Sequence, residues 1–581
     1  MKQLRRLFPY LLRRRRAYLL GLAIVVVATA FGAIAPPLVG YAVDQLRRGA
    51  TRDFILVISA VIAGAALARA GLLFISRYLI LAASRHVEFE LRNDLYRHLE
   101  SLSARWFDTN ATGEITSRAI NDIEGVRTMI GIGIMAIVST GLLFLASLVI
   151  MFATNAFLAA LFVLPLAGVS AVMAWTGGRM HDLSNEVQAQ LGVLSTRAQE
   201  NFTGARVVRA FAQEDNEIAR FRGECGEYRR RNLKLALWRS SSWASILILA
   251  EGAMIVTLLV GGRAIIGGSL TPGVLTTFAA YQFQLLWPMI AIGWVISIIQ
   301  RGVACMGRLN EIFEAKPDCD DEKALRGEVP LEGLIEARNL TFAYSPDRAP
   351  ALREVSFSIR PGQKVAIVGR TGAGKSTIVQ LLLRHYKLPD GMLFVDGRDV
   401  NTIPLHELRG AFGTVPQDLF LFSDKLRENI AFGGLNGVPE ESIVRAAAIS
   451  RLEADLDQFP DRLDQVIGER GVTLSGGQRQ RTALARAVVR EPRILILDDA
   501  LSAVDSHTER EIQDRLRVFM KGRTTLVITH RISAITDADL ILVLEDGRVV
   551  ERGTHAVLAA AGGPYAALWE SQRLSEELQK T

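Results

Sequence analysis

The sequence predicts a multidomain protein, in which an all-α polytopic membrane domain with six transmembrane helices precedes a soluble α/β domain. Its 581 residues exceed the roughly 250 to 300 at which a single hydrophobic core stops growing. Of these, 50% are hydrophobic and 22% are charged, a mixture that suits an apolar membrane part joined to a soluble part. Long apolar segments come first, and short apolar strands alternating with helices follow. We expect a transmembrane domain over 1–315, a linker over 316–333 and an α/β domain over 334–581.

The six predicted spans are apolar segments of about the 20 residues that a bilayer-crossing helix needs. The segments between them at 84–127 and 177–239 are long and rich in arginine, whereas the other connections are short. The long segments should therefore face the cytoplasm and the short turns should lie outside. Apolar residues recur at helical spacing within both long segments, so we expect the membrane helices to extend into the cytosol. The spans lie near 17–43, 54–80, 129–153, 156–176, 242–266 and 273–299.

The charge distribution argues against a nucleic-acid partner, and the cysteine spacing argues against a disulfide or a metal site. The net charge is +7, but basic blocks such as Arg13 to Arg16 flank apolar spans, which is typical of cytoplasmic membrane flanks and not of a nucleic-acid surface. We expect no nucleic-acid partner. Cys225, Cys305 and Cys319 have neither paired nor metal-ligand spacing, so we expect free cytosolic thiols. The first apolar run is too long for a signal peptide and should be a retained helix.

Nucleotide chemistry is indicated in the second half by the segment GRTGAGKST, which follows the strand KVAIV and opens a helix. Glycines let backbone N–H groups surround phosphate, while the Lys375 ammonium reaches the terminal phosphates and the Ser376 hydroxyl ligates Mg²⁺. The helix N-terminus adds a favourable dipole. This predicts an α/β P-loop ATPase domain with ATP and Mg²⁺ as cofactors. The loop comprises Gly369, Arg370, Thr371, Gly372, Ala373, Gly374, Lys375, Ser376 and Thr377.

Two further segments accompany the P-loop. The strand ILILD at 494–498 has the apolar run of a buried parallel strand and ends in Asp498, where a second Mg²⁺ ligand belongs. Before it, LSGGQRQR at 474–481 places glycines at the start of a helix, which leaves backbone N–H groups open to a second phosphate-binding surface. The acidic, proline-containing stretch AKPDCDDEKALRGEVPLEG marks the linker that precedes the whole domain.

With these motifs the sequence resembles the ABC family over essentially its whole length. In that family two nucleotide domains pair head to tail, and ATP is held between the P-loop of one and the LSGGQ signature of the other. The resemblance implies that Tyr344 stacks on adenine, Gln417 senses Mg²⁺ and the attacking water, and His530 contacts the γ-phosphate. It also implies that Asp505 lies in a loop that crosses the dimer interface. Contacts with nucleotide across the interface are implied for Ser475, Gly476, Gly477 and Gln478.

Membrane spans that precede the nucleotide domain resemble the exporter branch of this family. The segments 106–127 and 206–215 are similar to the two exporter cytoplasmic loops, each of which carries a short coupling helix that rests on a nucleotide domain. VIGERG, at 466–471, is similar to the exporter segment that touches these loops. The resemblance implies a half-transporter of the bacterial inner (cytoplasmic) membrane, with a second half-transporter as partner and a cytoplasmic ATPase domain.

One position departs from the family pattern. Exporters that hydrolyse ATP rapidly usually carry Glu directly after the Mg²⁺-binding Asp, whereas this sequence has Asp499. Its side chain is one methylene shorter, and a displacement of about 1 Å can cost orders of magnitude in catalysis that depends on positioning. We expect a slow or non-hydrolytic site, although Asp499 could also replace Glu without consequence. Asp499 beside an intact LSGGQ resembles one half of the heterodimeric bacterial multidrug exporters.

The expected function is therefore ATP-driven export of hydrophobic or amphipathic compounds, which include small molecules, lipids or peptides. The alternatives are a homodimeric exporter or a lipid floppase that uses Asp499 as a slow catalytic base, or a mainly regulatory nucleotide-binding half. Charged residues within spans are costly and suggest function. Glu251 either lines the transport path or makes an interhelical hydrogen bond, and Arg69 should snorkel towards an interface. The candidate substrate contacts are Glu251, Gln284, Trp287 and Trp294, with Gln282 as further polar surface and with tryptophan also a common interface anchor.

Overall fold

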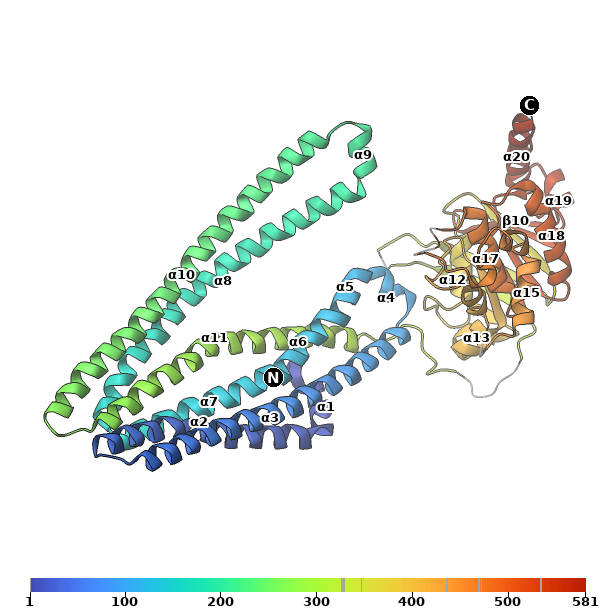
Figure 1. The fold of residues 1–581 in the computed structure, drawn as a ribbon. Helices are drawn as coiled ribbons and strands as arrows, with labels where there is room; N and C mark the ends of the chain where they lie inside the picture. The colour runs from blue at the N-terminus through green and yellow to red at the C-terminus, as the bar shows by residue number, and fades with distance from the viewer. Residues whose placement is uncertain are drawn as a thin grey trace. The chain divides into compact units, whose positions relative to one another are not determined.

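The structure is a computed structural model that describes residues 2–324, 330–345, 347–434, 437–468, 471, 473–532 and 535–580. The chain forms two compact units. The first comprises residues 1–100 and 112–315, and the second comprises residues 101–111 and 316–581 (Figure 1). Segment 101–111 lies within the predicted membrane domain in sequence, yet it groups with the second unit.

The first unit consists of helices only in its described residues, and the longest of them lie side by side, as α8 and α10 do in Figure 1. A continuous helical stretch over 112–154 includes two short π-helical segments, η2 and η3. The helices are η1 Lys2–Leu7, α1 Phe8–Arg13, α2 Arg15–Arg47, α3 Arg52–Ser101, α5 Thr112–Ser117, η2 Arg118–Asp122, α6 Ile123–Thr128, η3 Met129–Gly133, α7 Ile134–Thr154, α8 Ala156–Thr203, α9 Ala205–Ala210, α10 Glu214–Ile266 and α11 Pro272–Glu314.

Five helical stretches in the described part of the chain are long and apolar enough to cross a membrane: 15–47, 52–101, 112–154, 214–266 and 272–314. The remaining predicted span, 156–176, forms the beginning of α8. Six membrane-spanning helices therefore stay a prediction, with α8 as the sixth. Helices α3, α8 and α10 continue well beyond their apolar segments, as expected from the helical spacing. The outer connections are short turns, also as expected.

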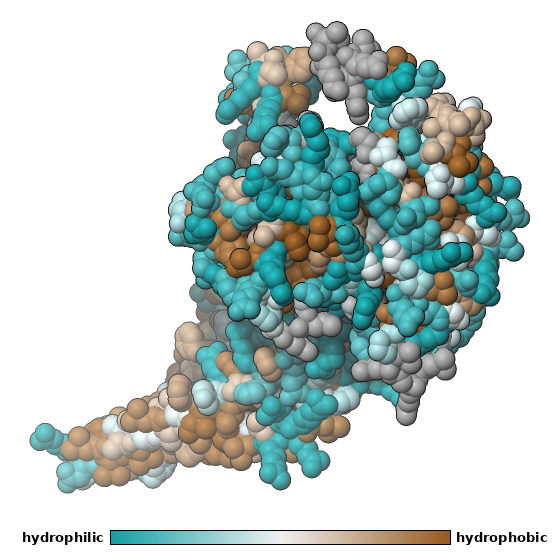
Figure 2. All heavy atoms as spheres, turned by 90° about the vertical axis from the view of Figure 1, so that its right-hand side faces the viewer, coloured by the Kyte–Doolittle hydropathy of each residue, from teal (hydrophilic) through white to brown (hydrophobic). Residues whose placement is uncertain are grey.

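The surface of these helices is apolar where a bilayer would contact it. Leu67 and Phe74 of α3 are 74% and 73% exposed. Figure 2 shows hydrophobic side chains covering the long helices at the lower left, whereas the α/β unit that faces the viewer is largely hydrophilic. Inside the bundle, Tyr281 of α11 is fully buried and donates a hydrogen bond to the carbonyl of Ala33 in α2. The fold class predicted from composition and apolar segments is confirmed for this half.

The second unit contains two sheets. An antiparallel sheet of order β2-β1-β4-β5 is built from β1 Ile335–Phe342, β2 Leu352–Ile359, β4 Leu393–Val395 and β5 Arg398–Asp399. The larger sheet has the order β10-β9-β3-β8-β7-β6, in which only the β9–β10 pairing is antiparallel. Its strands are β3 Lys364–Gly369, β6 Phe412–Val415, β7 Ile494–Asp498, β8 Thr524–Ile528, β9 Leu540–Glu545 and β10 Arg548–Gly553.

Both faces of the larger sheet are covered, which accounts for its uninterrupted apolar strands. Every residue of β7 and of β8 is buried, which is the pattern of parallel strands covered on both faces. The described helices of the unit are α4 Ala104–Thr109, α12 Lys375–Leu382, η4 Val400–Thr402, α13 Leu405–Ala411, α14 Leu426–Ala431, α15 Glu440–Ile449, α16 Glu453–Leu456, η5 Arg462–Asp464, α17 Gly476–Val488, α18 Ser506–Met520, α19 His555–Ala560 and α20 Pro564–Lys580.

The beginning of the predicted linker lies against the second unit. The buried guanidinium of Arg384 donates to the carbonyls of Asp320 and Ile403. Lys323 pairs with Asp390 at 2.6 Å. Cys319 is buried beside them, and this burial raises the pKa of its thiol. Residues 325–329 of the predicted linker lie outside the described residues. The described acidic part of the linker is therefore attached to the domain surface by specific contacts.

Candidate ATP-binding site

Four of the predicted site segments meet at one edge of the larger sheet. The P-loop follows β3, Gln417 follows β6, Asp498 ends β7 and His530 follows β8. These four strands are mutually parallel and adjacent in the order β3-β8-β7-β6, so their carboxyl ends lie at the same edge. Ligands of open α/β sheets bind at this edge. Gln417 and His530 are both exposed there, as groups that reach a ligand must be.

Lys375, the first residue of α12, turns back over the P-loop. Its ammonium donates to the carbonyls of Gly369 at 2.9 Å and Arg370 at 3.0 Å. The side chain is buried, and this desolvation lowers the pKa of Lys375, with the nearby carboxylates of Asp498 and Asp499 acting in the opposite direction. A buried cation bonded to neutral carbonyls favours an anionic ligand. The loop is therefore prepared for phosphate.

Glycine is required at two P-loop positions by the backbone. Gly374 has a φ of +97°, and a Cβ there would lie 2.7 Å from the carbonyl oxygen of Ala351. A Cβ on Gly369 would lie 2.2 Å from the carbonyl oxygen of Leu544. Both contacts are with backbone atoms, which cannot move aside. The loop conformation that exposes the N–H groups to phosphate thus depends on these two glycines.

Ser376 and Asp498 supply the oxygen atoms that would hold Mg²⁺. The Ser376 hydroxyl hydrogen bonds to the buried Asp498 carboxyl group. Burial raises the pKa of Asp498, and the neighbouring Asp499 carboxylate raises it further, so this carboxylate would be stabilised by a cation. No cluster of three or more His, Cys, Asp and Glu that could hold a metal occurs among the described residues. Two protein oxygens completed by substrate phosphates fit the way Mg²⁺ is usually bound.

Asp499 lies next to this pair in a constrained backbone. Its φ is +52°, in the left-handed region that aspartate tolerates better than most residues. Its N–H donates to the carbonyl of Ile528 at 2.8 Å, and its carbonyl accepts from the Ser502 hydroxyl at 3.1 Å. These bonds fix the Cα position. The distance that the carboxylate can reach is therefore set by the length of the side chain.

The signature segment begins α17 with a complete capping box. The Ser475 hydroxyl accepts from the N–H of Gln478 at 3.2 Å, and the Gln478 side chain accepts from the N–H of Ser475 at 3.0 Å. Cβ atoms on Gly476 and Gly477 would lie 3.3 Å from the Ala503 Cβ and 3.2 Å from its carbonyl oxygen. Glycine therefore permits the helix start to approach the segment that precedes Asp505. Asp505 in turn caps α18, accepting from the N–H of Thr508 at 3.0 Å.

Gln480 connects the signature helix to the Asp499 loop, a role that the sequence did not reveal. Its buried side chain donates to the Ser502 hydroxyl at 2.9 Å and accepts from the N–H of Ala503 at 2.8 Å. It also lies 3.4 Å from the carbonyl oxygen of Asp499. The residue is within the LSGGQRQR motif, but only the fold shows which loop it touches.

Tyr344 belongs to an aromatic cluster beside the P-loop. Its hydroxyl lies 3.0 Å from the Thr377 hydroxyl, and its ring packs edge-on against Tyr386 with centroids 5.0 Å apart. The Tyr386 hydroxyl donates to Asp108 of α4 at 2.5 Å. Burial raises the pKa of Tyr386, and the hydrogen bond to Asp108 raises it further, so the hydroxyl stays a donor at neutral pH. Tyr344, predicted to stack on adenine, is thus linked to segment 101–111.

Comparison with known proteins decides the family. The family model described as ABC transporter transmembrane region matches residues 18–289, and the model described as ABC transporter matches residues 352–502. The chain is 33% identical over 574 residues to the multidrug resistance-like ATP-binding protein MdlA of Escherichia coli, covering 98% of this chain and 96% of that protein. The chain is an ABC exporter. Three sequence predictions are confirmed: membership of the ABC exporter family, ATPase activity, and placement in a bacterial inner membrane with the ATPase domain in the cytoplasm.

Two further relatives of this ABC exporter extend the comparison. It is 34% identical over 521 residues to the ATP-dependent lipid A-core flippase of Nitrosococcus oceani, covering 89% of this chain and 86% of that protein. It also superposes on a solved structure of a bacterial Atm1-family ABC exporter with ATP bound. That match has a TM-score of 0.79 and 29% identity, and it covers 97% of this chain and 98% of the other.

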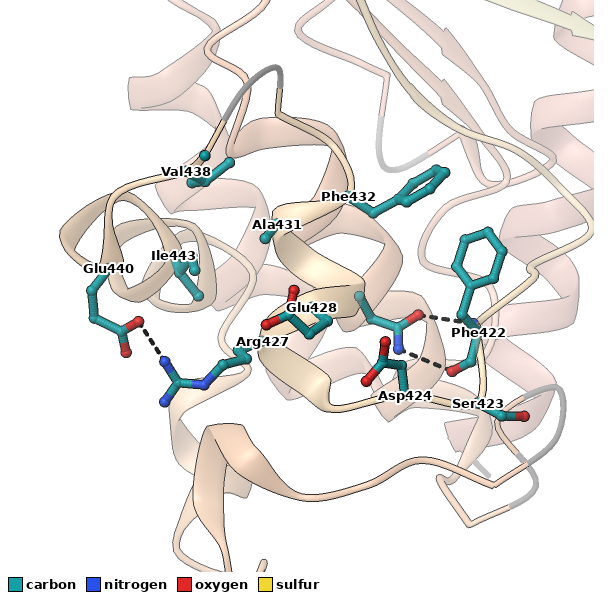
Figure 3. A pocket seen from close by; sticks show the side chains of 12 residues that line it. Phe422, Ser423, Asp424, Arg427, Glu428, Ala431, Phe432, Val438, Glu440 and Ile443 are labelled. Atoms are coloured by element: carbon teal, nitrogen blue, oxygen red, sulfur yellow. Dashed lines mark hydrogen bonds and ion pairs between the residues drawn. The ribbon is translucent and has the colours of Figure 1, made fainter. Parts of the chain in front are cut away.

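A groove of about 780 Å³ lies beside the exporter's Gln417 segment (Figure 3). Phe422 and Phe432 are 40% and 64% exposed at one side of it, and the Arg427 guanidinium pairs with Glu440 across the other. Asn429 fixes the Phe422 backbone through two hydrogen bonds. Exposed aromatic rings in a groove rimmed by the carboxylates of Asp424 and Glu428 suit an apolar segment with basic flanks.

The predicted loop segments are distributed between the two units. Segment 106–127 contains most of α4, which lies in the nucleotide-binding unit. Segment 206–215 contains most of α9 at the end of the α8–α10 hairpin, where Phe211 is 72% exposed. In VIGERG, Val466 forms a bridge with Lys425, whereas residues 469 and 470 lie outside the described residues.

The candidate substrate residues lie on α10 and α11. Glu251, Trp287 and Trp294 are exposed in the single chain. Gln284 donates to the carbonyl of Gly32 at 3.0 Å, and Gln282 donates to that of Ala250. The two glutamines therefore connect α11 to neighbouring helices. A substrate-contact role for all four candidates stays a prediction.

Proposed function

We propose that this ABC exporter is one half of a heterodimer that exports hydrophobic or amphipathic compounds, and that its own ATP site hydrolyses slowly or not at all. ATP binding closes the nucleotide domains, and the cytoplasmic helices move the membrane halves apart. The observation that carries the proposal is Asp499. Its backbone is held by Ile528 and Ser502, so the shorter carboxylate cannot move forward to the position of a glutamate.

Pairing with a second half-transporter is supported by two surfaces. Ser475 starts a helix whose open N–H groups are suited to phosphate held by a partner. The end of the α8–α10 hairpin exposes Val207 and Phe211 beside Arg206 and Arg209. The two apolar side chains are complementary to the aromatic rings of the groove in Figure 3, and the two arginines are complementary to its carboxylates. A hairpin from one half resting in the groove of the other would couple ATP binding to the membrane helices.

The proposed substrate class is supported by the exposed apolar surface of the long helices and by the relatives. One relative is named as multidrug resistance-like and another as a lipid A-core flippase, and both classes of compound are amphipathic. Glu251 and Trp287 are the residues proposed to contact them. A homodimeric exporter or lipid floppase in which Asp499 acts as a slow base is the second candidate, which the flippase relative favours.

Steady-state ATPase of the reconstituted transporter tests the proposal. Replacing Asp499 by Asn should change overall hydrolysis by less than about threefold, whereas removing a glutamate base from the partner should lower it by roughly 10². Asp498→Asn is the matched control, because it removes the adjacent metal ligand and should weaken nucleotide binding at this site. Collapse of hydrolysis in Asp499→Asn would make this aspartate the working base and support the second candidate.

A further inference from the structure

The backbone on either side of Arg531 is hydrogen bonded to one side chain of the C-terminal helix. Gln572 of α20 accepts from the N–H of Ile532 at 2.7 Å, and its amide nitrogen donates to the carbonyl of His530. One side-chain amide thus pairs with the carbonyl and the N–H of the same short segment, as a neighbouring strand would. His530 lies just after the end of β8, at the edge of the sheet where the P-loop also lies.

Helix α20 is itself firmly attached, so it can serve as a fixed point. Tyr565 in its first turn is fully buried, and its N–H donates to the Glu551 carboxylate at 2.9 Å. Leu568 and Trp569 pack against the main hydrophobic core of the unit. Gln572 comes about one turn after these anchors. Its position is therefore set by the core, independently of the loop that it holds.

The opposite side of the loop is held by a second set of contacts. The Arg531 guanidinium pairs with the buried Glu509 of α18 and donates to the carbonyl of Ser502 at 3.0 Å. The Arg531 N–H donates to the Thr529 hydroxyl at 3.0 Å. His530 thus has its carbonyl bonded to Gln572 and is followed by a residue held on the opposite side, which restricts its backbone, while its side chain is exposed.

We propose that Gln572 is a positioning residue for His530, which it holds in place for contact with the γ-phosphate of bound ATP. The inference rests on the proposed role of His530. A histidine that contacts only the γ-phosphate distinguishes ATP from ADP, because ADP lacks that group. Loosening its backbone should therefore weaken ATP binding selectively. This effect does not require hydrolysis, so it is independent of the competence of Asp499.

The test measures the affinities of a non-hydrolysable ATP analogue and of ADP for the full chain in lipid nanodiscs. Gln572→Ala should lower the preference for the ATP analogue by roughly threefold to tenfold, from the loss of two backbone hydrogen bonds, with ADP affinity unchanged. His530→Ala should lower it at least as much. Ser571→Ala is the matched control, because Ser571 is exposed on the adjacent position of α20 and alanine favours helix.

Hydrogen exchange of the amides of residues 528–532 provides the second measurement. Gln572→Ala should accelerate exchange at Ile532, whose N–H loses its acceptor, while the amides of α20 keep their protection. An unchanged ATP preference in Gln572→Ala, with a reduced preference in His530→Ala, would overturn the positioning role alone. An unchanged preference in His530→Ala would refute the assigned contact of His530 and the inference with it.

Discussion

Replacing Tyr386 by phenylalanine would remove one hydroxyl and leave its ring against Tyr344. In the structure this hydroxyl donates to Asp108 and attaches α4, the short helix of the first cytoplasmic loop, to the nucleotide-binding unit. Ser103 of the same segment makes a longer contact, with Asp318 at 3.3 Å. The Tyr386→Phe variant therefore tests whether this single hydrogen bond holds the loop.

The magnitude follows from the charge and exposure of the pair. Hydrogen bonds to charged groups contribute about 1.5 to 3 kcal/mol when well buried. Asp108 is exposed and Tyr386 is half-buried, so a value near the lower limit, about 1 to 1.5 kcal/mol, is appropriate. At 1.4 kcal/mol per factor of ten, the attached state of α4 should become roughly fivefold to tenfold less favoured.

Hydrogen exchange of peptides covering 101–111 in the full-length transporter measures this change directly. Tyr386→Phe and Asp108→Ala should each accelerate exchange by about that factor, and the double variant should add little, which gives a coupling energy of about 1 kcal/mol. Tyr344→Phe is the control, because it removes the contact with Thr377 and leaves Asp108 untouched. Additive effects of the two single changes would refute the reasoning.

Four other outcomes are expected. Lys375→Ala should weaken ATP binding at this chain's own P-loop by about tenfold or more, as seen by nucleotide titration; equal affinity would contradict the P-loop assignment. Ser475→Ala should destabilise α17 by about 1 kcal/mol and impair turnover at the partner's ATP site, and normal turnover would argue against head-to-tail pairing. Gln480→Leu should lower the melting temperature, since three hydrogen bonds between the signature helix and the Asp499 loop are lost, and should lower turnover at the partner's ATP site, which this helix serves; an unchanged melting temperature would contradict the role of these bonds. Glu251→Gln should alter drug-stimulated ATPase more than dimer assembly; the reverse pattern would indicate a structural carboxyl.

The sequence was sufficient where short-range patterns determine the structure. KVAIVG, RILILD and TTLVIT became β3, β7 and β8, because an uninterrupted apolar run suits a strand covered on both faces. Once these strands are parallel, the residues that follow them must share one edge. The apolar strand pattern that predicts the parallel sheet therefore also predicts that the P-loop and Asp498 lie at one edge of it.

Contacts between distant segments could not be predicted in this way. Asp108 and Tyr386 are 278 positions apart, and nothing in the local sequence of either indicates the other. The acidic linker was expected from composition, yet only the structure shows Arg384 holding the carbonyl of Asp320. Gln480 and Gln572 lie on helices. The spacing of apolar residues can predict a helix and its buried face, but it cannot predict which loop a polar side chain holds.

The capping box at Ser475 has a consequence for how two halves assemble. Its hydroxyl oxygen accepts from Gln478 within the same helix, which leaves the hydroxyl proton available for a ligand, and the start of α17 is already ordered in the single chain. In the proposed pairing, this chain's contribution to the partner's ATP site is thus formed before the partner binds. If the two halves pair as proposed, association has no helix to fold at this surface, and ordering of α17 should not limit its rate.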